Sequence, residues 1–202
     1  MSPTHPALSG PQGGRLTALD APPDGGWTVD DLETFPEDGV RRELLDGVLL
    51  VRPSPPVVHQ QIAMRLMAAL QDGGPTEYDV NQGVQIRLGP RTAFSPDVLA
   101  VTEDAARRCG NHFFPGEVVL AIEVVAGASA TMDRITKPAL YAAAGIPSYW
   151  IVETDGRVTV RTYALDGDAG AYRATGEFDG TLEIDDPWPA VISLTELAPP
   201  FL

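Results

Sequence analysis

The most apolar segment of the chain, residues 117–125, carries an acidic residue, Glu123, near its end. Its length and composition predict a strand, and its nearly continuous apolar character predicts that both faces are covered, as in the centre of a sheet. A carboxylate in such a strand is costly unless it is paired, hydrogen-bonded or bound to a metal. Residues 117–125 therefore predict a sheet covered by other elements, and they mark Glu123 as a candidate site residue.

Turn signals and periodicity divide the rest of the chain. Asp-Gly pairs at 46–47 and 155–156 each separate two apolar runs, which predicts an N-terminal and a C-terminal hairpin. Apolar residues at helical spacing predict helices over 59–70 and 131–144. Short helices are expected after Thr28 and over 104–109, and further strands over 77–81, 83–88, 97–102, 171–175 and 181–185. This order predicts an α/β or α+β fold, with a mixed central sheet flanked by helices and a C-terminal hairpin extension.

Length and composition suit one soluble domain, which we expect to span residues 27–202. Residues 1–26 are rich in proline and glycine and have few large apolar side chains, so we expect a mostly disordered leader. The start of the chain lacks a signal-peptide pattern and no apolar run is long enough to span a membrane, which favours the cytoplasm. A single cysteine, Cys109, excludes an internal disulfide and a cysteine zinc site.

The net charge of −14 speaks against a generic duplex-binding surface, because 14 Lys and Arg stand against 28 Asp and Glu. Proteins that bind duplex DNA usually carry a basic patch, so non-specific attraction to phosphates is expected to be weak here. Two arrangements would reconcile this charge with a nucleic-acid substrate. A bound divalent metal would reverse the local sign, or the charges would be segregated between faces.

Two acids and a lysine form the candidate constellation: Asp97 at a strand start, Glu123 in its strand, and Lys137 fourteen positions later in a helix. Magnesium is usually held by one or two carboxylates with waters and substrate oxygens, and the main-chain carbonyl of Val124 would add an oxygen ligand. The lysine would position the attacking water or stabilise developing negative charge. This combination indicates a metal-dependent phosphodiesterase. Pro138 predicts either a kink or a helix that begins near 137.

An ordered series of segments resembles the PD-(D/E)XK nuclease superfamily, and its longer pattern is similar to the Uma-type restriction endonuclease branch. Together these segments cover about residues 28–165. The matching segments are Arg42-Glu-Leu-Leu-Asp-Gly, Pro53-Ser-Pro-Pro-Val-Val-His59, Ser95-Pro-Asp-Val-Leu-Ala-Val, Ala121-Ile-Glu-Val-Val, Asp133-Arg-Ile-Thr-Lys137 and Tyr141-Ala-Ala-Ala-Gly-Ile-Pro-Ser-Tyr-Trp-Ile-Val.

The resemblance implies a mixed sheet with flanking helices and a nuclease site that uses Mg²⁺ or Mn²⁺ on DNA. By position, Asp97 and Glu123 are implied as metal ligands and Lys137 as the catalytic lysine. Glu43 matches an acidic residue near the site that acts through a metal-bound water. His59 matches a histidine at the start of the second helix, whose role the resemblance does not define.

The chain departs from the family pattern at three places. Val125 stands where the superfamily lysine usually lies, and the Uma-type branch displaces that lysine onto the next helix, as at Lys137. Residues 125–129 read Val-Ala-Gly-Ala-Ser where the branch usually reads Leu-Ser-Pro-Ser-Thr, and Pro138 follows the lysine directly. These departures alter the surroundings of the site without removing an implied ligand.

Other interpretations remain open. Asp97 can be a turn acceptor, Lys137 a solvated helix residue, and Glu43 a surface partner of Arg41 or Arg42. As a whole, the chain can be a nuclease-fold module that does not cut and binds a protein partner with a basic surface. A third possibility is a hydrolase that uses Asp97 and Glu123 as an acid/base pair without metal. A homodimer is also expected, because many nucleases that cut both strands pair two sites.

Overall fold

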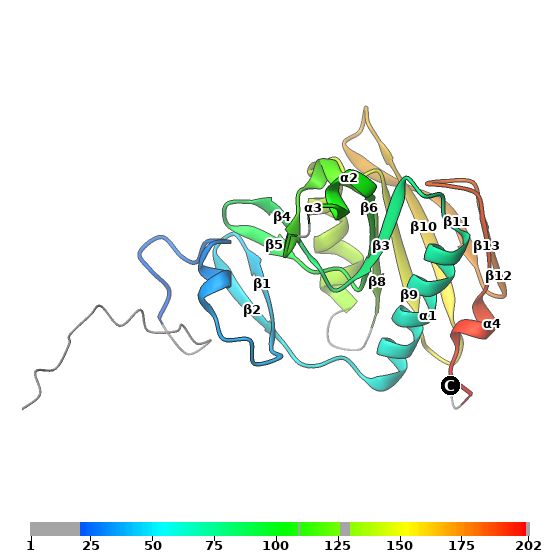
Figure 1. The fold of residues 1–202 in the computed structure, drawn as a ribbon, viewed down its shortest axis with the longest axis horizontal. Helices are drawn as coiled ribbons and strands as arrows, with labels where there is room; N and C mark the ends of the chain where they lie inside the picture. The colour runs from blue at the N-terminus through cyan, green and yellow to red at the C-terminus, as the bar shows by residue number, and fades with distance from the viewer. Residues whose placement is uncertain (1–20, 109, 126–129, 201–202) are drawn as a thin grey trace, which may run out of the picture.

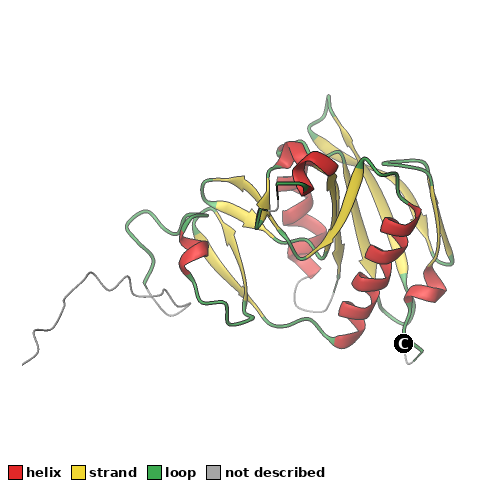
Figure 2. Cartoon of the chain, in the orientation of Figure 1, coloured by secondary structure: helices red, strands yellow, loops and turns green. Residues whose placement is uncertain are grey.

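The computed structural model describes residues 21–108, 110–125 and 130–200. Most of the expected leader, residues 1–20, lies outside the described residues, as do residues 126–129, where the turn after Glu123 departs from the family pattern. The described chain forms a six-stranded sheet, a five-stranded sheet and a two-stranded ribbon, with few helices (Figures 1 and 2). This mixed α+β architecture confirms the expected fold class.

The six-stranded sheet forms the centre of the molecule, in the order β11-β10-β9-β8-β6-β3. Strand β8 pairs antiparallel with β6 and parallel with β9, so the sheet is mixed. The apolar run of residues 117–125 is this inner strand β8, as expected. Its strands are β3 (Tyr78–Gln82), β6 (Val98–Thr102), β8 (Val118–Val124), β9 (Ser148–Glu153), β10 (Thr159–Asp166) and β11 (Ala171–Phe178).

The five-stranded sheet has the order β2-β1-β5-β4-β7 and lies beside the central sheet (Figure 1). Its first hairpin turns at Asp46-Gly47, and both residues have positive φ, which an Asp-Gly turn tolerates. Its strands are β1 (Arg41–Leu45), β2 (Val48–Arg52), β4 (Gln85–Gly89), β5 (Thr92–Phe94) and β7 (His112–Phe113). The two short strands β5 and β7 were not predicted, because three and two residues are too few to show a periodicity.

Side-chain alternation on the central strands separates two cores. In β8, Leu120, Ile122 and Val124 pack toward α1 and the C-terminal ribbon, whereas Ala121 packs toward α3 and the five-stranded sheet. Successive strand residues point to opposite faces, so Glu123 faces α3. The elements on the first face are α1 (Val57–Gly73), β12 (Thr181–Ile184), β13 (Ala190–Ser193) and α4 (Leu194–Leu197).

The helix that follows β8 begins in an unusual way. Met132–Thr136 form a π-helical turn, and α3 continues over Lys137–Ala143 with Pro138 near its first position. The Lys137 amide donates to the Met132 carbonyl, so the backbone is helical from the π-helical turn into α3. Pro138 was expected to give either a kink or a helix that begins near 137; α3 does begin at Lys137, but the π-helical turn leads directly into it. The side chain of Lys137 lies against the end of β8, 2.8 Å from Glu123.

The remaining short elements are minor. The expected helix after Thr28 is a 3₁₀ turn, η1 (Asp31–Thr34). Of the helix expected over 104–109, the described residues form the short α2 (Glu103–Ala106), and residue 109 lies outside them; η2 (Pro115–Glu117) comes later in the chain. Strand β13 was not predicted. Within the part of the chain that the structure describes, no helix has the length and apolar character needed to cross a membrane.

Candidate active site

Glu123 is a buried carboxylate at the end of β8, with 2% of its surface exposed. Its Oε1 accepts hydrogen bonds from Lys137 Nζ at 2.8 Å and from the Tyr141 hydroxyl at 3.2 Å. Burial raises the pKa of Glu123 to about 8; the charge of Lys137 opposes this shift, and Asp97 adds to it. Near neutral pH the Glu123 carboxyl group is therefore either protonated or stabilised as a carboxylate by a nearby cation.

Lys137 lies at the centre of an acidic cluster and is 2% exposed. Its ammonium group is 2.8 Å from Glu123, 3.1 Å from Glu43 and 3.5 Å from Asp133, which precedes it by one helical turn. Burial alone would lower the pKa of Lys137, but the surrounding carboxylates reverse this and raise it above its ordinary value. Lys137 is thus a fixed positive charge, which excludes the reading as a solvated helix residue.

Asp97 lies directly before β6, and its carboxylate is held from three directions. Oδ2 accepts the Val124 amide at 2.8 Å and lies 3.0 Å from His59 Nε2, while Oδ1 accepts Arg41 Nη1 at 2.8 Å. Burial would raise the pKa of Asp97, but the hydrogen bond from His59 and the charge of Arg41 lower it to about 2. Unlike Glu123, Asp97 is ionised throughout the neutral range.

Glu43 belongs to the same cluster although it comes from the other sheet. It is 1% exposed on β1 and accepts the Ser95 amide and Arg52 Nε, both at 3.1 Å. Burial opposes its ionisation, yet Lys137 and Arg41 lower its pKa. Glu43 does lie 3.9 Å from Arg41, as one interpretation expected, but it is not a surface residue, because its carboxylate is buried and contacts Lys137.

These side chains open into one cavity of about 120 Å³, between the two sheets and the loop that leads from β2 into α1. The cavity is lined by Arg41, Glu43, Arg52, Pro53, Ser54, Pro55, Pro56, His59, Asp97, Glu123, Val124, Asp133 and Lys137. A cavity needs only ~10–15 Å³ to hold one water, so this one has room for a hydrated ion. All six predicted site residues therefore line the same cavity.

The donors in this cavity fit a hard divalent cation. Asp97 and Glu123 supply two carboxylates, and the Val124 amide donates toward Asp97, so the Val124 carbonyl points to the same side of the strand. Across residues 21–108, 110–125 and 130–200, no group of three His, Cys, Asp or Glu side chains has the arrangement of a metal site. Two carboxylates and a main-chain carbonyl, completed by waters, form a donor set that a hard divalent cation such as Mg²⁺ accepts.

Three charged residues of the site were missed by the sequence analysis as functional residues. Arg41, Arg52 and Asp133 line the cavity, and each forms an ion pair with a predicted site residue. Arg41 and Arg52 flank a hairpin whose register, set by the Asp46-Gly47 turn, would have brought them together. Composition also draws attention to the surroundings of Lys137, which is the single lysine among the 202 residues, and Asp133 precedes it by one helical turn.

The fold and the site together define a protein of the restriction-endonuclease-like class. The structure is similar to the crystal structure of a putative nuclease belonging to DUF820 from Anabaena variabilis, with a TM-score of 0.63 and 16% sequence identity; the match covers 85% of this chain and 97% of that one. At this identity the similarity concerns the fold. The model of the Uma2 family, described as "Putative restriction endonuclease", matches residues 29–195, and the chain belongs to this family. No curated protein sequence matches the chain.

Proposed function

We propose that this protein is a divalent-metal-dependent endonuclease that hydrolyses phosphodiester bonds of DNA. Asp97, Glu123 and the Val124 carbonyl hold Mg²⁺ or Mn²⁺, and Lys137 is the catalytic lysine. The observation that carries the proposal is the position of the Lys137 ammonium group, 2.8 Å from Glu123 and open to the cavity that Asp97 also lines. Family membership supports the same class of reaction.

The metal, when bound, would polarise the phosphoryl oxygen and lower the pKa of a bound water. The role of Lys137 follows from its surroundings. It stays protonated because carboxylates surround it, so it acts as a donor that orients water or stabilises negative charge on the phosphoryl group, and not as a base. Glu43 fixes the position of the lysine, and His59 fixes the orientation of Asp97.

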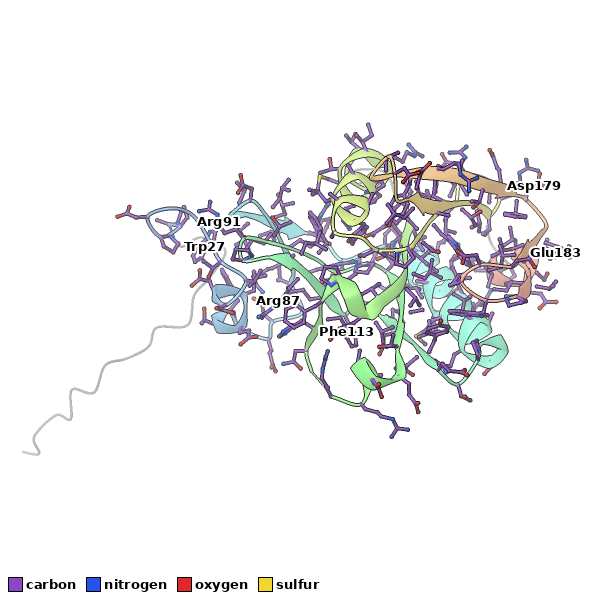
Figure 3. All side chains as sticks on the ribbon, turned by 90° about the horizontal axis from the view of Figure 1, so that it is seen from above. Trp27, Arg87, Arg91, Phe113, Asp179 and Glu183 are labelled. Atoms are coloured by element: carbon purple, nitrogen blue, oxygen red, sulfur yellow. The ribbon has the colours of Figure 1, made fainter. Side chains whose placement is uncertain are left out.

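The net charge of −14 is less adverse to this function than its size suggests. Residues 148–200, from the start of β9 to three residues past α4, contain ten Asp and Glu against three Arg. Asp179 and Glu183 from this stretch lie at the end of the molecule opposite Trp27 and Arg91 (Figure 3). In the site, the four acids Glu43, Asp97, Glu123 and Asp133 are opposed by Arg41, Arg52 and Lys137, so a bound divalent cation would make the cavity positive.

Cleavage of a supercoiled plasmid with Mg²⁺ or Mn²⁺ tests the proposal. We expect nicked and linear products from the wild-type protein, no products with a chelator, and loss of cleavage in Asp97→Ala, Glu123→Ala and Lys137→Ala. Arg107→Gln is a matched control, because Arg107 is 70% exposed and follows the end of β6 farthest from Asp97. Absence of cleavage with both metals, or equal cleavage by the three variants, would contradict the proposal. Activity that survives the chelator would instead favour the metal-free acid/base hydrolase.

The acidic surface of residues 148–200 favours one alternative, a nuclease-fold module that binds a protein partner with a basic surface. In that case the protein would bind such a partner without DNA, and titration with Mn²⁺ would give no heat.

A homodimer also stays a prediction, which light scattering coupled to size-exclusion chromatography would test.

A further inference from the structure

Two arginines face each other at the mouth of the cavity. Arg41 and Arg52 are directly opposite in the antiparallel pair of β1 and β2, so their side chains leave the same face of the hairpin. Like charges in this arrangement repel and destabilise a hairpin unless an anion lies between them. Glu43 is the acid that both share, at 3.9 Å from Arg41 Nη2 and 3.1 Å from Arg52 Nε, and Arg41 also pairs with Asp97 through Nη1 at 2.8 Å.

Both guanidinium groups keep unused donors. Arg41 Nε and Nη2 and Arg52 Nη2 are buried, and none has a hydrogen-bond partner in the part of the chain that the structure describes. Such donors are costly to leave unsatisfied, particularly on a charged group. The side chains are 24% and 20% exposed, whereas Lys137 below them is 3% exposed, so the two arginines are the cations that an incoming ligand meets first.

We propose that Arg41 and Arg52 form a guanidinium clamp for the phosphodiester group of the substrate. Arginine presents its donors in a planar fork that matches two oxygens of a phosphate. The clamp would supply, at the cavity itself, the local positive charge that the surface as a whole lacks. This inference rests on the proposed function, since it assigns the group that anchors the substrate of that same site.

Arg41 also links substrate binding to metal binding. Its Nη1 donates to Asp97 Oδ1, so the arginine and a metal ion would compete for the same carboxylate. A cation that replaces this contact would free Arg41 to donate to a phosphate oxygen. Arg52 has no contact with Asp97 and makes its hydrogen bond to Glu43. The two arginines should therefore differ in their effect on metal affinity while they share an effect on DNA binding.

Duplex binding and Mn²⁺ binding, measured side by side, test the clamp. We would measure fluorescence anisotropy of a labelled duplex at several salt concentrations, with Ca²⁺ in place of Mg²⁺ and the duplex checked for intactness, and Mn²⁺ binding by calorimetry. The variants are Arg41→Gln and Arg52→Gln, with Arg107→Gln as the remote charge control. Arg41→Lys and Arg52→Lys keep the charge that Glu43 needs, which covers the case in which a glutamine variant fails to fold.

We expect each glutamine variant to raise the duplex Kd by about tenfold and to reduce the salt slope by about one, and the lysine variants to restore the slope but only part of the affinity. Mn²⁺ affinity should stay unchanged in Arg52→Gln and increase in Arg41→Gln.

If the arginines only hold the carboxylates in place, Mn²⁺ affinity would fall and duplex affinity at saturating metal would match that of Arg107→Gln, which overturns the clamp. Wild-type protein that binds metal and cuts DNA while all arginine variants bind duplex normally overturns the clamp alone. Wild-type protein that binds neither metal nor duplex overturns both proposals.

Discussion

The ammonium group of Lys137 lies 2.8 Å from the Glu123 carboxylate although fourteen positions separate the two residues in the chain. The contact forms because β8 ends at Val124 and α3 begins at Lys137, so the end of the strand and the first turn of the helix lie against each other. Both side chains are almost fully buried. This pair links the stability of the fold to the chemistry of the site.

Replacing Lys137 with methionine should destabilise the protein by about 3–5 kcal/mol, because it leaves buried carboxylates without their shared cation. The free energy of unfolding from urea titrations at pH 7 measures this change. Arg107→Gln, which removes an exposed cation, should stay within about 0.5 kcal/mol of the wild-type protein. Equal stability of Lys137→Met and Arg107→Gln would show that the buried charges do not depend on the lysine.

Lys137→Arg should strongly reduce cleavage even though the positive charge remains. The lysine is held by Glu123, Glu43 and Asp133, with its ammonium group 5.7 Å from the centre of the Phe94 ring, and a planar guanidinium does not fit the same contacts. We expect a loss of activity of about 100-fold or more, on the scale of removing one preorganised donor. Plasmid cleavage rates measure the loss. Near-normal activity would mean that charge alone, without geometry, is sufficient.

Mn²⁺ affinity should depend on pH in the window set by Glu123. Its pKa is raised to about 8, so below that pH a proton must leave the carboxylate before a cation binds. We expect affinity to rise about tenfold per pH unit between pH 6 and 8, with release of about one proton per bound ion. Calorimetry in two buffers with different ionisation heats measures the released proton. A flat profile over this range would exclude Glu123 as the titrating ligand.

Asp97 should contribute to the free energy of unfolding in a more acidic pH window than the one set by Glu123. Its pKa falls from an ordinary 3.8 to about 2, so its stabilising contribution is present above pH 4 and is lost as the pH falls toward 2. The shift corresponds to about 2 kcal/mol. The difference in unfolding free energy between wild-type protein and Asp97→Asn should narrow by this amount between pH 5 and pH 2. A difference that stays constant would count against the ionised, hydrogen-bonded Asp97.

His59→Ala should weaken metal binding and cleavage by roughly 10–100-fold without abolishing either, as expected for a residue that orients a metal ligand. The reason is the 3.0 Å contact from His59 Nε2 to Asp97 Oδ2, which holds the carboxylate toward the cavity. His112→Ala is the matched control, since His112 lies on β7 and does not line the cavity. Mn²⁺ calorimetry and plasmid cleavage measure the two effects. A complete loss of binding would instead make His59 a direct ligand.

Local patterns predicted much of the fold because several elements can be identified from a few consecutive residues. The Asp46-Gly47 turn defines the first hairpin, and the apolar run before Glu123 defines the inner strand. Strands β5, β7 and β13 have two to four residues and acquire their conformation from neighbours, so no local pattern identified them. The π-helical turn before Lys137 likewise depends on how α3 packs against the sheet.

The acids and the lysine of the site were predicted, whereas the arginines that pair with the acids were not identified as site residues. Glu123 was identified by the cost of its burial, and Asp97 and Lys137 by their order in a family pattern. Arg41 and Arg52 look like ordinary surface residues in the sequence, and only the pairing of β1 with β2 and the packing of two sheets bring them to the cavity.

The site is assembled from both sheets, with Arg41, Glu43 and Arg52 on one and Asp97 and Glu123 on the other. If the two sheets separated, the buried charges on each sheet would lose their partners of opposite sign on the other sheet. The ionic cluster therefore holds the two sheets together. Breathing of the β1–β2 hairpin and disassembly of the site are consequently the same event. The local opening that governs amide exchange in β1 thus also governs the fraction of molecules that have a complete site at any moment.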